Sequence, residues 1–302
     1  MTQVGSIYEH ARWREPSGAT LNRRRRSALR VDAFLLLGGG LRPDPLSRAT
    51  GRPLLDMPVE RGRTLLDWWM HHAADVARRS TDGVLPMRVM IDASQKPPTI
   101  RRSTTRIRCD VQRDLSDFRG VGGLLRDVAA THGDDDMLLV ANASQPIVDP
   151  WPQAIATLAK ARADIALMVD SPGGPTGLML IRCGALRSVA PICYGGFKEQ
   201  ALPQLARLHD VRIVRSRSSA IAPMRTSAHY LAGLNQLNTP RHGSTFAVTE
   251  NGSNVHPDAR LNHCVVLRGA SVGAGAVVSR SVICGGAQVP AGAVVVDRVV
   301  TA

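Results

Sequence analysis

The chain has 302 residues, of which 44% are hydrophobic and 21% charged, with a formal net charge of +13 and five scattered cysteines. This length accommodates one large α/β domain and a smaller module. No unbroken apolar run approaches the roughly 18 residues of a membrane span, and no CxxC pair indicates a zinc site or a disulfide framework. We therefore expect a cytoplasmic protein with reduced thiols.

The positive charge comes almost entirely from arginine, since the only lysines are Lys96, Lys160 and Lys198. A basic surface attracts phosphates, nucleotides and nucleic acids alike, so the charge alone does not choose among them. Residues 1–30 contain the run Arg23 to Arg26 and are interpreted as a basic flexible tail; a nucleic-acid-binding arm is the alternative.

An apolar run, Phe34 to Leu37, breaks into three glycines and then into a loop containing Arg42 and Arg52. A buried strand followed by a glycine turn lets main-chain N–H groups come close to a phosphate. The candidate phosphate-binding residues are Gly38, Gly39 and Gly40. An ordinary exit from a strand is the alternative interpretation.

Apolar runs and helical periodicities then alternate along the chain. They predict helices and strands at Thr64–Ala77, Leu85–Ile91, Arg106–Val111, Leu124–His132, Met137–Ala141, Gln153–Arg162, Ile165–Val169, Thr176–Leu180, Gly196–Leu205 and Val211–Val214. Such alternation is typical of an α/β fold with a mainly parallel sheet, which we assign to residues 31–238. Residues 239–252 are rich in Gly, Ser, Thr and Asn and are predicted to be a linker.

Residues 253–302 repeat with a period of 17, and apolar residues recur within each repeat at steps of five or six. These positions are Val255, Leu261, Val266, Val272, Val278, Ile283, Val289 and Val295. A hexapeptide-type repeat places one short strand on each of three faces and buries the apolar positions as a continuous core. We expect little more than two coils, docked on the other domain or on another subunit.

The loop from Gly38 to Leu54 resembles the signature of sugar-1-phosphate nucleotidyltransferases, the NDP-sugar pyrophosphorylases, which reads roughly GGxGTRLxPLT followed by PKPL. The matching residues are Gly38, Gly40, Arg42, Pro45, Leu46, Ser47, Pro53 and Leu54. Leu37, Leu41 and Arg52 depart from the pattern, since they replace a glycine, the threonine and the lysine. The resemblance implies a Rossmann-like (GT-A-like) α/β sheet, and the tail resembles the left-handed parallel β-helix that many members carry.

Three further segments resemble family motifs around the substrates. GVGGLL resembles the family's GTAGAL segment against the nucleotide base, which implies nucleotide binding by Gly120, Gly122 and Gly123. The pair Thr176 and Gly177 resembles the border of the sugar pocket, and the GFKEQ segment with Lys198 and Glu199 resembles a helix start that contacts the sugar phosphate.

The metal positions depart from the family. Where family members hold magnesium with an aspartate after the central strand, this chain has Ser144, and Pro223 to Leu231 lacks the second aspartate. Serine is a weak neutral ligand for a hard divalent ion, which prefers carboxylate oxygen. No metal ligand is therefore identified, although the family reaction requires Mg²⁺.

The resemblance implies that NTP and a sugar-1-phosphate form an NDP-sugar and pyrophosphate, with Arg42 on the departing phosphates and Arg52 in place of the activating lysine. The alternative is a catalytically silent relative that senses a nucleotide or sugar nucleotide, or that regulates or scaffolds a partner, because loss of metal ligands weakens ion binding. We expect a homo-oligomer or a partner subunit through the β-helix, no membrane, and no principal role for nucleic acid.

Overall fold

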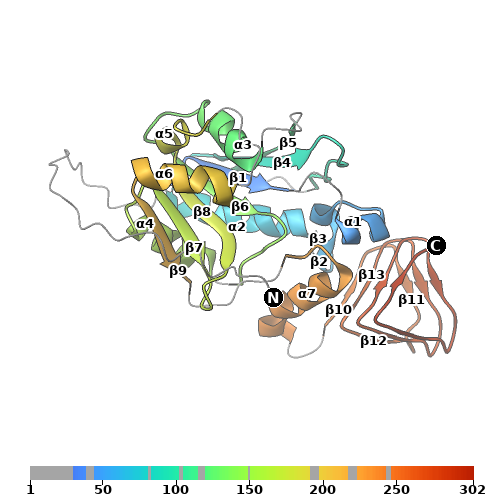
Figure 1. Ribbon diagram of the computed structural model, residues 1–302. Coiled ribbons are helices and arrows are strands. Elements are labelled where there is room, and N and C mark those ends of the chain that lie inside the picture. Colours follow the sequence, from blue (N-terminus) through green and yellow to red (C-terminus); the bar gives the residue numbers. More distant parts are fainter. Residues whose placement is uncertain are drawn as a thin grey trace.

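The computed structural model describes residues 30–38, 44–80, 83–101, 105–114, 120–148, 150–190, 197–216, 223–242 and 246–302. The basic tail with Arg23 to Arg26 lies outside these residues. The described chain consists of an α/β domain and, C-terminal to it, a three-sided stack of short strands (Figure 1). No described helix has the length and apolar character that crossing a membrane requires.

Seven strands form the central sheet in the order β5-β4-β1-β6-β8-β7-β9. They are β1 (Ala33–Leu37), β4 (Leu85–Asp92), β5 (Ile107–Asp114), β6 (Met137–Asn142), β7 (Ile165–Val169), β8 (Pro175–Arg182) and β9 (Val211–Arg215). Strand β1 is parallel to both neighbours, and β8 is antiparallel to both of its neighbours. The chain runs outward from β1 through β4 to β5 and then returns to the other side of β1 as β6. Ligands of open α/β sheets bind at the carboxyl ends of the strands at such a reversal.

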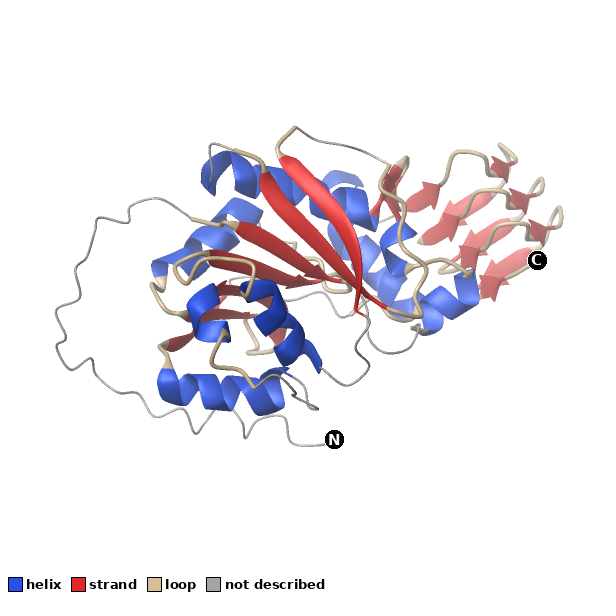
Figure 2. Cartoon of the chain, turned by 90° about the horizontal axis from the view of Figure 1, so that it is seen from above, coloured by secondary structure: helices blue, strands red, loops and turns tan. Residues whose placement is uncertain are grey.

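Helices cover both faces of this sheet (Figures 1 and 2). The helical segments are α1 (Pro45–Thr50), η1 (Leu54–Asp56), α2 (Leu65–Ser80), α3 (Gly120–Ala129), α4 (Trp151–Lys160), α5 (Cys183–Leu186), η2 (Phe197–Ala201), α6 (Leu202–Leu208) and α7 (Ser227–His242). In β1, Phe34 and Leu36 pack with α2 and α4, whereas Ala33 and Leu35 pack with α3, α5 and α6. Because side chains alternate along a strand, both faces of β1 are apolar and the strand is an uninterrupted hydrophobic run.

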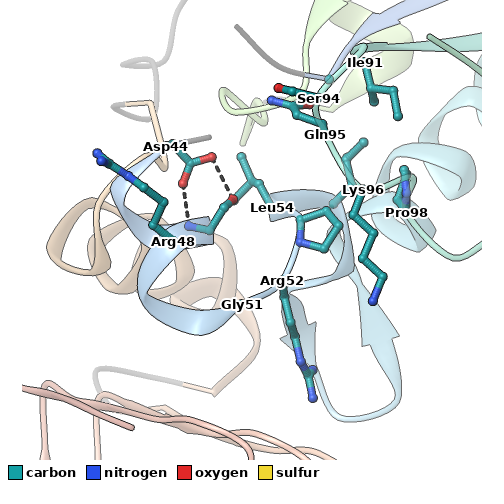
Figure 3. Close-up of a pocket in the computed structure, with 14 residues that line it drawn as sticks. Asp44, Arg48, Gly51, Arg52, Leu54, Ile91, Ser94, Gln95, Lys96 and Pro98 are labelled. Atoms are coloured by element: carbon teal, nitrogen blue, oxygen red, sulfur yellow. Dashed lines mark hydrogen bonds between the residues drawn. The ribbon is translucent and has the colours of Figure 1, made fainter. Parts of the chain in front are cut away.

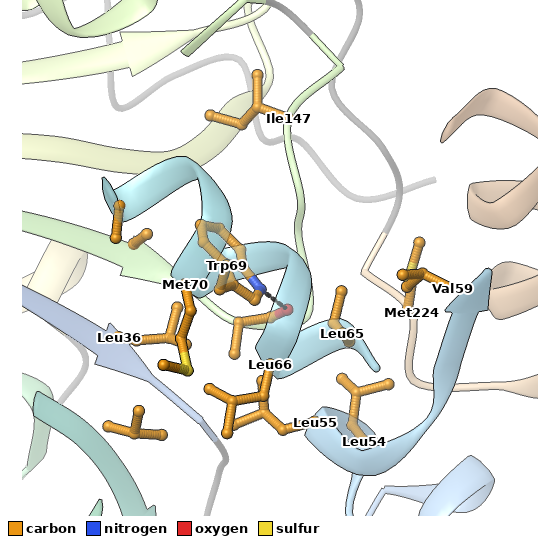
Figure 4. Close-up of a cluster of buried hydrophobic side chains, with 14 of the residues drawn as sticks. Leu36, Leu54, Leu55, Val59, Leu65, Leu66, Trp69, Met70, Ile147 and Met224 are labelled. Atoms are coloured by element: carbon orange, nitrogen blue, oxygen red, sulfur yellow. Dashed lines mark hydrogen bonds between the residues drawn. The ribbon is translucent and has the colours of Figure 1, made fainter. Parts of the chain in front are cut away.

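The helix predicted at Thr64–Ala77 is α2, and its buried face meets the end of β6. Trp69 is fully buried, and its Nε1 donates to the carbonyl of Ala143 at 3.1 Å (Figure 4). Its ring also packs edge-on against Trp151 of α4, with centroids 5.2 Å apart. Buried indole N–H groups need such a partner, and this bond fixes α2 to the residue that directly follows β6.

Several elements differ from the sequence prediction. Helix α3 begins at Gly120 rather than Leu124, and α1, α7 and the hairpin of β2 (Pro58–Glu60) and β3 (Arg63–Thr64) were not predicted. The hydroxyl of Thr226 accepts the backbone N–H of His229 at 3.2 Å, so a capping threonine begins α7. The segment 239–252, predicted to be a linker, includes the end of α7 and strand β10 (Ala247–Thr249).

The C-terminal strands form three parallel sheets, β10-β13-β16-β19, β11-β14-β17 and β12-β15-β18. The strands after β10 are β11 (Asn254–Val255), β12 (Arg260–Asn262), β13 (Cys264–Val266), β14 (Ser271–Val272), β15 (Val277–Ser279), β16 (Val282–Ile283), β17 (Gln288–Val289), β18 (Val294–Val296) and β19 (Val299–Val300). Ala247 pairs with Cys264 and Val265 with Val282, which is the 17-residue period of the sequence. All eight apolar positions of that period belong to one interior cluster. We call residues 247–302 the coil stack; it contains more strands than two coils would supply.

In the sheet β10-β13-β16-β19 of the coil stack, the strands β13 and β16 are buried on both sides. Cys264 and Val266 face the interior of the stack, whereas Val265 and Leu267 belong to the core of the α/β domain. Cys284 Sγ donates to the carbonyl of Ala49 in α1 at 3.7 Å. The two parts of the chain therefore share one hydrophobic core.

This shared core predicts a large loss of stability when an outward-facing residue of that sheet is truncated. Leu267 is fully buried, so Leu267→Ala should lower the free energy of unfolding by about 2–5 kcal/mol. Val294 lies on β18 and is 71% exposed, so the control Val294→Ala should change it by less than about 0.5 kcal/mol. Denaturant unfolding followed by circular dichroism measures both. Equal effects of the two substitutions would contradict the shared core.

Candidate functional site

A pocket of about 270 Å³ opens where β1 and β4 end (Figure 3). Its lining residues are Gly38, Asp44, Ser47, Arg48, Gly51, Arg52, Pro53, Leu54, Leu55, Ile91, Ser94, Gln95, Lys96 and Pro98. The pocket lies on the same edge of the sheet as the reversal between β1 and β6. Two of the candidate site residues predicted from the sequence, Gly38 and Arg52, line it, together with Ser47, Pro53 and Leu54 of the loop that resembles the family signature.

Gly38 is the residue at which β1 enters the pocket. Its N–H donates to the carbonyl of Met90 at 2.7 Å. A Cβ atom at this position would lie 3.0 Å from that oxygen and 3.1 Å from Cγ2 of Ile91. A side chain here would crowd the end of β4, so the position favours glycine. Gly39, Gly40 and Arg42 lie outside the described residues.

Helix α1 forms one wall of the pocket. Asp44 caps this helix by accepting the N–H of Ser47 at 2.7 Å and its hydroxyl at 2.9 Å. Gly51 ends the helix in the left-handed conformation, with φ of 67°, which favours glycine. Part of the loop that resembles the family signature is therefore a short capped helix, and the chain turns at Gly51 into Arg52.

The side chain of Arg52 is bonded to the coil stack. Its Nη1 donates to Oε2 of Glu250 at 2.7 Å, where Arg52 is 24% exposed and Glu250 is 8% exposed. The same carboxylate oxygen accepts the backbone N–H of Arg268 at 2.7 Å. The arginine expected to replace the activating lysine is thus paired with a buried acid, and its catalytic role stays a prediction.

The opposite wall consists of Ser94, Gln95, Lys96 and Pro98, to which the sequence analysis assigned no role. Asp92, the last residue of β4, accepts the N–H of Ser94 at 2.9 Å. Farther along, the N–H of Thr99 donates to Oδ1 of the buried Asp56 at 2.8 Å. One signal in the sequence could have found this wall, because Lys96 is one of only three lysines and follows a strand.

The residues expected at the sugar pocket meet the end of β6. Gly177 has φ of 76°, and a Cβ atom there would lie 2.8 Å from Cβ of Asn142, so this close approach also requires glycine. Thr176 is buried and donates its hydroxyl to the carbonyl of Met168 at 3.0 Å. The structure therefore brings Thr176 and Gly177 to the strand end that precedes Ser144.

Ser144 stands where the resemblance implies an aspartate that holds magnesium. Its hydroxyl donates to Oδ1 of Asn142 at 3.0 Å, and the residue is 6% exposed. No group of three or more His, Cys, Asp or Glu residues in the described ranges converges as a metal site would. Neutral hydroxyl and amide groups do not supply the carboxylate oxygens that hold a hard divalent ion. The described residues here do not fit a magnesium site of the family type.

The glycines of α3 and the segment η2 lie together on the face of the sheet that α3, α5 and α6 cover. Gly120 begins α3 with φ of 61°, and Gly122 and Gly123 are buried. The segment η2 packs against α3, and its Lys198 and Glu199 lie at the surface. Partial desolvation of its amine lowers the pKa of Lys198, and the charge of Glu199 opposes that shift. None of these residues lines the pocket beside Gly38.

Comparison with known proteins supports the fold and no closer relationship. No protein-family model matches the sequence, and no curated protein does. The structure of HddC from Yersinia pseudotuberculosis is similar, with 13% identity, a TM-score of 0.50, and coverage of 68% of this chain and 98% of that chain. HddC complexed with GMP-PN is 11% identical, with a TM-score of 0.48 and coverage of 68% of this chain and 98% of that chain. A homologue of Mycobacterium tuberculosis rv0371c from Mycobacterium sp. strain JC1 is 17% identical, with a TM-score of 0.47 and coverage of 70% of this chain and 100% of that chain. The domain around the pocket therefore shares the α/β fold of HddC.

The bond between Arg52 and Glu250 predicts that the acid is needed for stability. Glu250→Ala leaves the partly buried guanidinium and the Arg268 N–H without their acceptor, which should lower the free energy of unfolding by about 1–3 kcal/mol. Asp297 pairs with Arg280 on the exposed surface of the coil stack, so the control Asp297→Ala should have no measurable effect. Chemical denaturation of both variants measures the difference. An unfolding midpoint unchanged by Glu250→Ala would show that the pair contributes nothing.

Proposed function

We propose that this protein binds a nucleotide or sugar nucleotide through its phosphates at the pocket beside Gly38. One observation carries the proposal: a glycine whose missing side chain leaves room for the end of β4 follows a buried parallel strand at the reversal of the strand order, beside a pocket lined by Arg48, Arg52 and Lys96. Such a position lets main-chain groups and basic side chains approach an anionic ligand. Gly39, Gly40 and Arg42 would continue this phosphate-binding turn.

The first candidate activity is that of a sugar-1-phosphate nucleotidyltransferase. A phosphate oxygen of the sugar-1-phosphate would form a bond to the α-phosphorus of the NTP, and the bond to the departing pyrophosphate would break. Arg42 would bind the departing phosphates, and Arg52 would stand where the family has lysine. Gly120, Gly122 and Gly123 would pack against the base, and the sugar phosphate would meet Thr176, Gly177, Lys198 and Glu199. The coil stack would be a left-handed parallel β-helix through which copies of the chain associate.

Turnover tests this candidate directly. The purified protein, incubated with each NTP, a panel of sugar-1-phosphates and magnesium, should release pyrophosphate, and chelation of the metal should stop the release. Gly38→Val should reduce the rate by at least about tenfold, because misplacing positioned groups by an ångström costs that much or more. Val294→Ala, on the exposed face of the coil stack, should retain the rate. Absence of pyrophosphate release across the whole panel would rule out this activity.

The second candidate is a catalytically silent relative that binds the nucleotide as a sensor or as a regulatory or scaffolding subunit. Two observations favour it. Ser144 replaces the metal-binding aspartate and uses its hydroxyl in a bond to Asn142, and Arg52 is paired with Glu250. Positioning of the phosphates would remain, whereas the neutralisation of charge that phosphoryl transfer requires would be missing.

A thermal shift separates the two candidates. A ligand that binds only the folded protein stabilises it by about 2.7 kcal/mol at a concentration of 100 times its Kd. For a sensor, we expect NTP or NDP-sugar to raise the melting temperature without any turnover, and Gly38→Val to abolish the rise. A rise in Gly38→Val equal to that of the original protein would place the ligand elsewhere.

A further inference from the structure

The pocket beside Gly38 has three described cationic side chains, and they differ in what they are bonded to. Arg52 donates to Glu250, whereas no ion pair of Arg48 or Lys96 forms within the described ranges. In Figure 3, the side chain of Arg48 extends away from Lys96 and Arg52, while Lys96 and Arg52 extend in a common direction. Among the described residues, Arg48 and Lys96 are thus the pocket cations without an acidic partner, and Lys96 is the one on the wall opposite α1.

Arg52 is not readily released to a ligand. Moving its guanidinium onto a phosphate would leave Glu250, at 8% exposure, with a buried charge and without its cationic partner. Removing one partner of a buried charge pair costs more than the pair contributes, because the remaining charge is neither hydrated nor paired. The carboxylate of Glu250 therefore keeps Arg52 on the coil stack.

Lys96 is held in place at both ends of its loop. On one side, Ser94 donates its N–H to Asp92 at 2.9 Å, and Gln95 donates its N–H to the carbonyl of Asp92 at 3.0 Å. On the other side, Thr99 donates its N–H to the buried Asp56 at 2.8 Å. Pro97 and Pro98 fix two backbone dihedrals between these anchors. The loop is thus pre-organised around Lys96 by bonds in which its side chain has no part.

We propose that Lys96 is the residue that binds a ligand phosphate in this pocket, and that Arg52 is a positioning residue that joins the α1 wall to Glu250 of the coil stack. The assignment rests on the proposed function and adds the cation that meets the anion. An ammonium group is a compact charge with rotatable donors on a flexible stem, and it suits a phosphate whose position is set by main-chain groups.

The experiment compares Lys96→Gln with Lys160→Gln and Glu250→Gln in the full chain. Lys160 is an exposed lysine at the end of α4, which leads to the opposite edge of the sheet, and it is the matched control. Isothermal titration with inorganic pyrophosphate and then with NTP measures affinity, and thermal unfolding without ligand measures stability. Lys96→Gln should weaken binding about tenfold or more, as expected for loss of one charge-assisted hydrogen bond, without changing the melting temperature.

The control and the partner variant should give the complementary results. Lys160→Gln should change neither quantity. Glu250→Gln should lower the melting temperature and leave affinity within about threefold, because Arg52 does not meet the ligand directly. Lys96→Arg, which keeps the charge, should recover part of the affinity.

The outcomes distinguish this assignment from the proposed function. Binding of NTP that survives Lys96→Gln overturns the assignment and leaves nucleotide binding intact. Binding of pyrophosphate but of no NTP, lost in Lys96→Gln, supports the assignment and overturns nucleotide binding. Failure of the original protein to bind either anion overturns both. A Glu250→Gln variant that keeps its melting temperature but loses anion binding would make Arg52 the phosphate ligand instead.

Discussion

Burial of β1 on both faces is the constraint on which the site depends. Because α2 and α4 cover one face and α3, α5 and α6 cover the other, β1 cannot shift relative to its neighbours without exposing apolar side chains or breaking two parallel ladders. Its end is therefore fixed at Gly38, where the N–H bonds to β4 and the missing Cβ leaves room for Met90 and Ile91 of that strand. The pocket is positioned by the core rather than by the loops that line it.

Burial of β13 and β16 on both of their sides joins the coil stack to the α/β domain. The residues of β13 and β16 alternate between the interior of the stack and the core of the α/β domain, so the sheet that they form is apolar throughout. The other two sheets of the stack show outward-facing polar residues such as Arg260 and Gln288. Docking on this one side brings Glu250 to Arg52 and Cys284 to α1. The coil stack is consequently part of the pocket's support and not only an appended module.

The sequence predicted the features that local pattern encodes. The strand that ends at Gly38, the buried face of α2 and the interior positions of the 17-residue repeat follow from periodicity, and the structure confirms each of them. Helix α7 was not predicted because its apolar residues form no clear stripe, and its start is marked by a capping threonine, Thr226. The wall with Lys96 was not predicted because proline-rich loops carry no periodicity, and its position follows from bonds to Asp56 in a distant segment.

The exchange of lysine for arginine at position 52 shows the limit of reading a site from its motif. The resemblance implied a phosphate ligand there, because the neighbouring proline and leucine match. The partner that determines what Arg52 does is Glu250, which lies 198 positions away in the sequence and is brought close only by docking of the coil stack. A forked guanidinium suits this task, since it can hold a carboxylate in a fixed geometry. In this chain the charge of Arg52 is used to hold the two parts of the protein together, and Lys96, on the opposite wall of the pocket, has no acidic partner among the described residues.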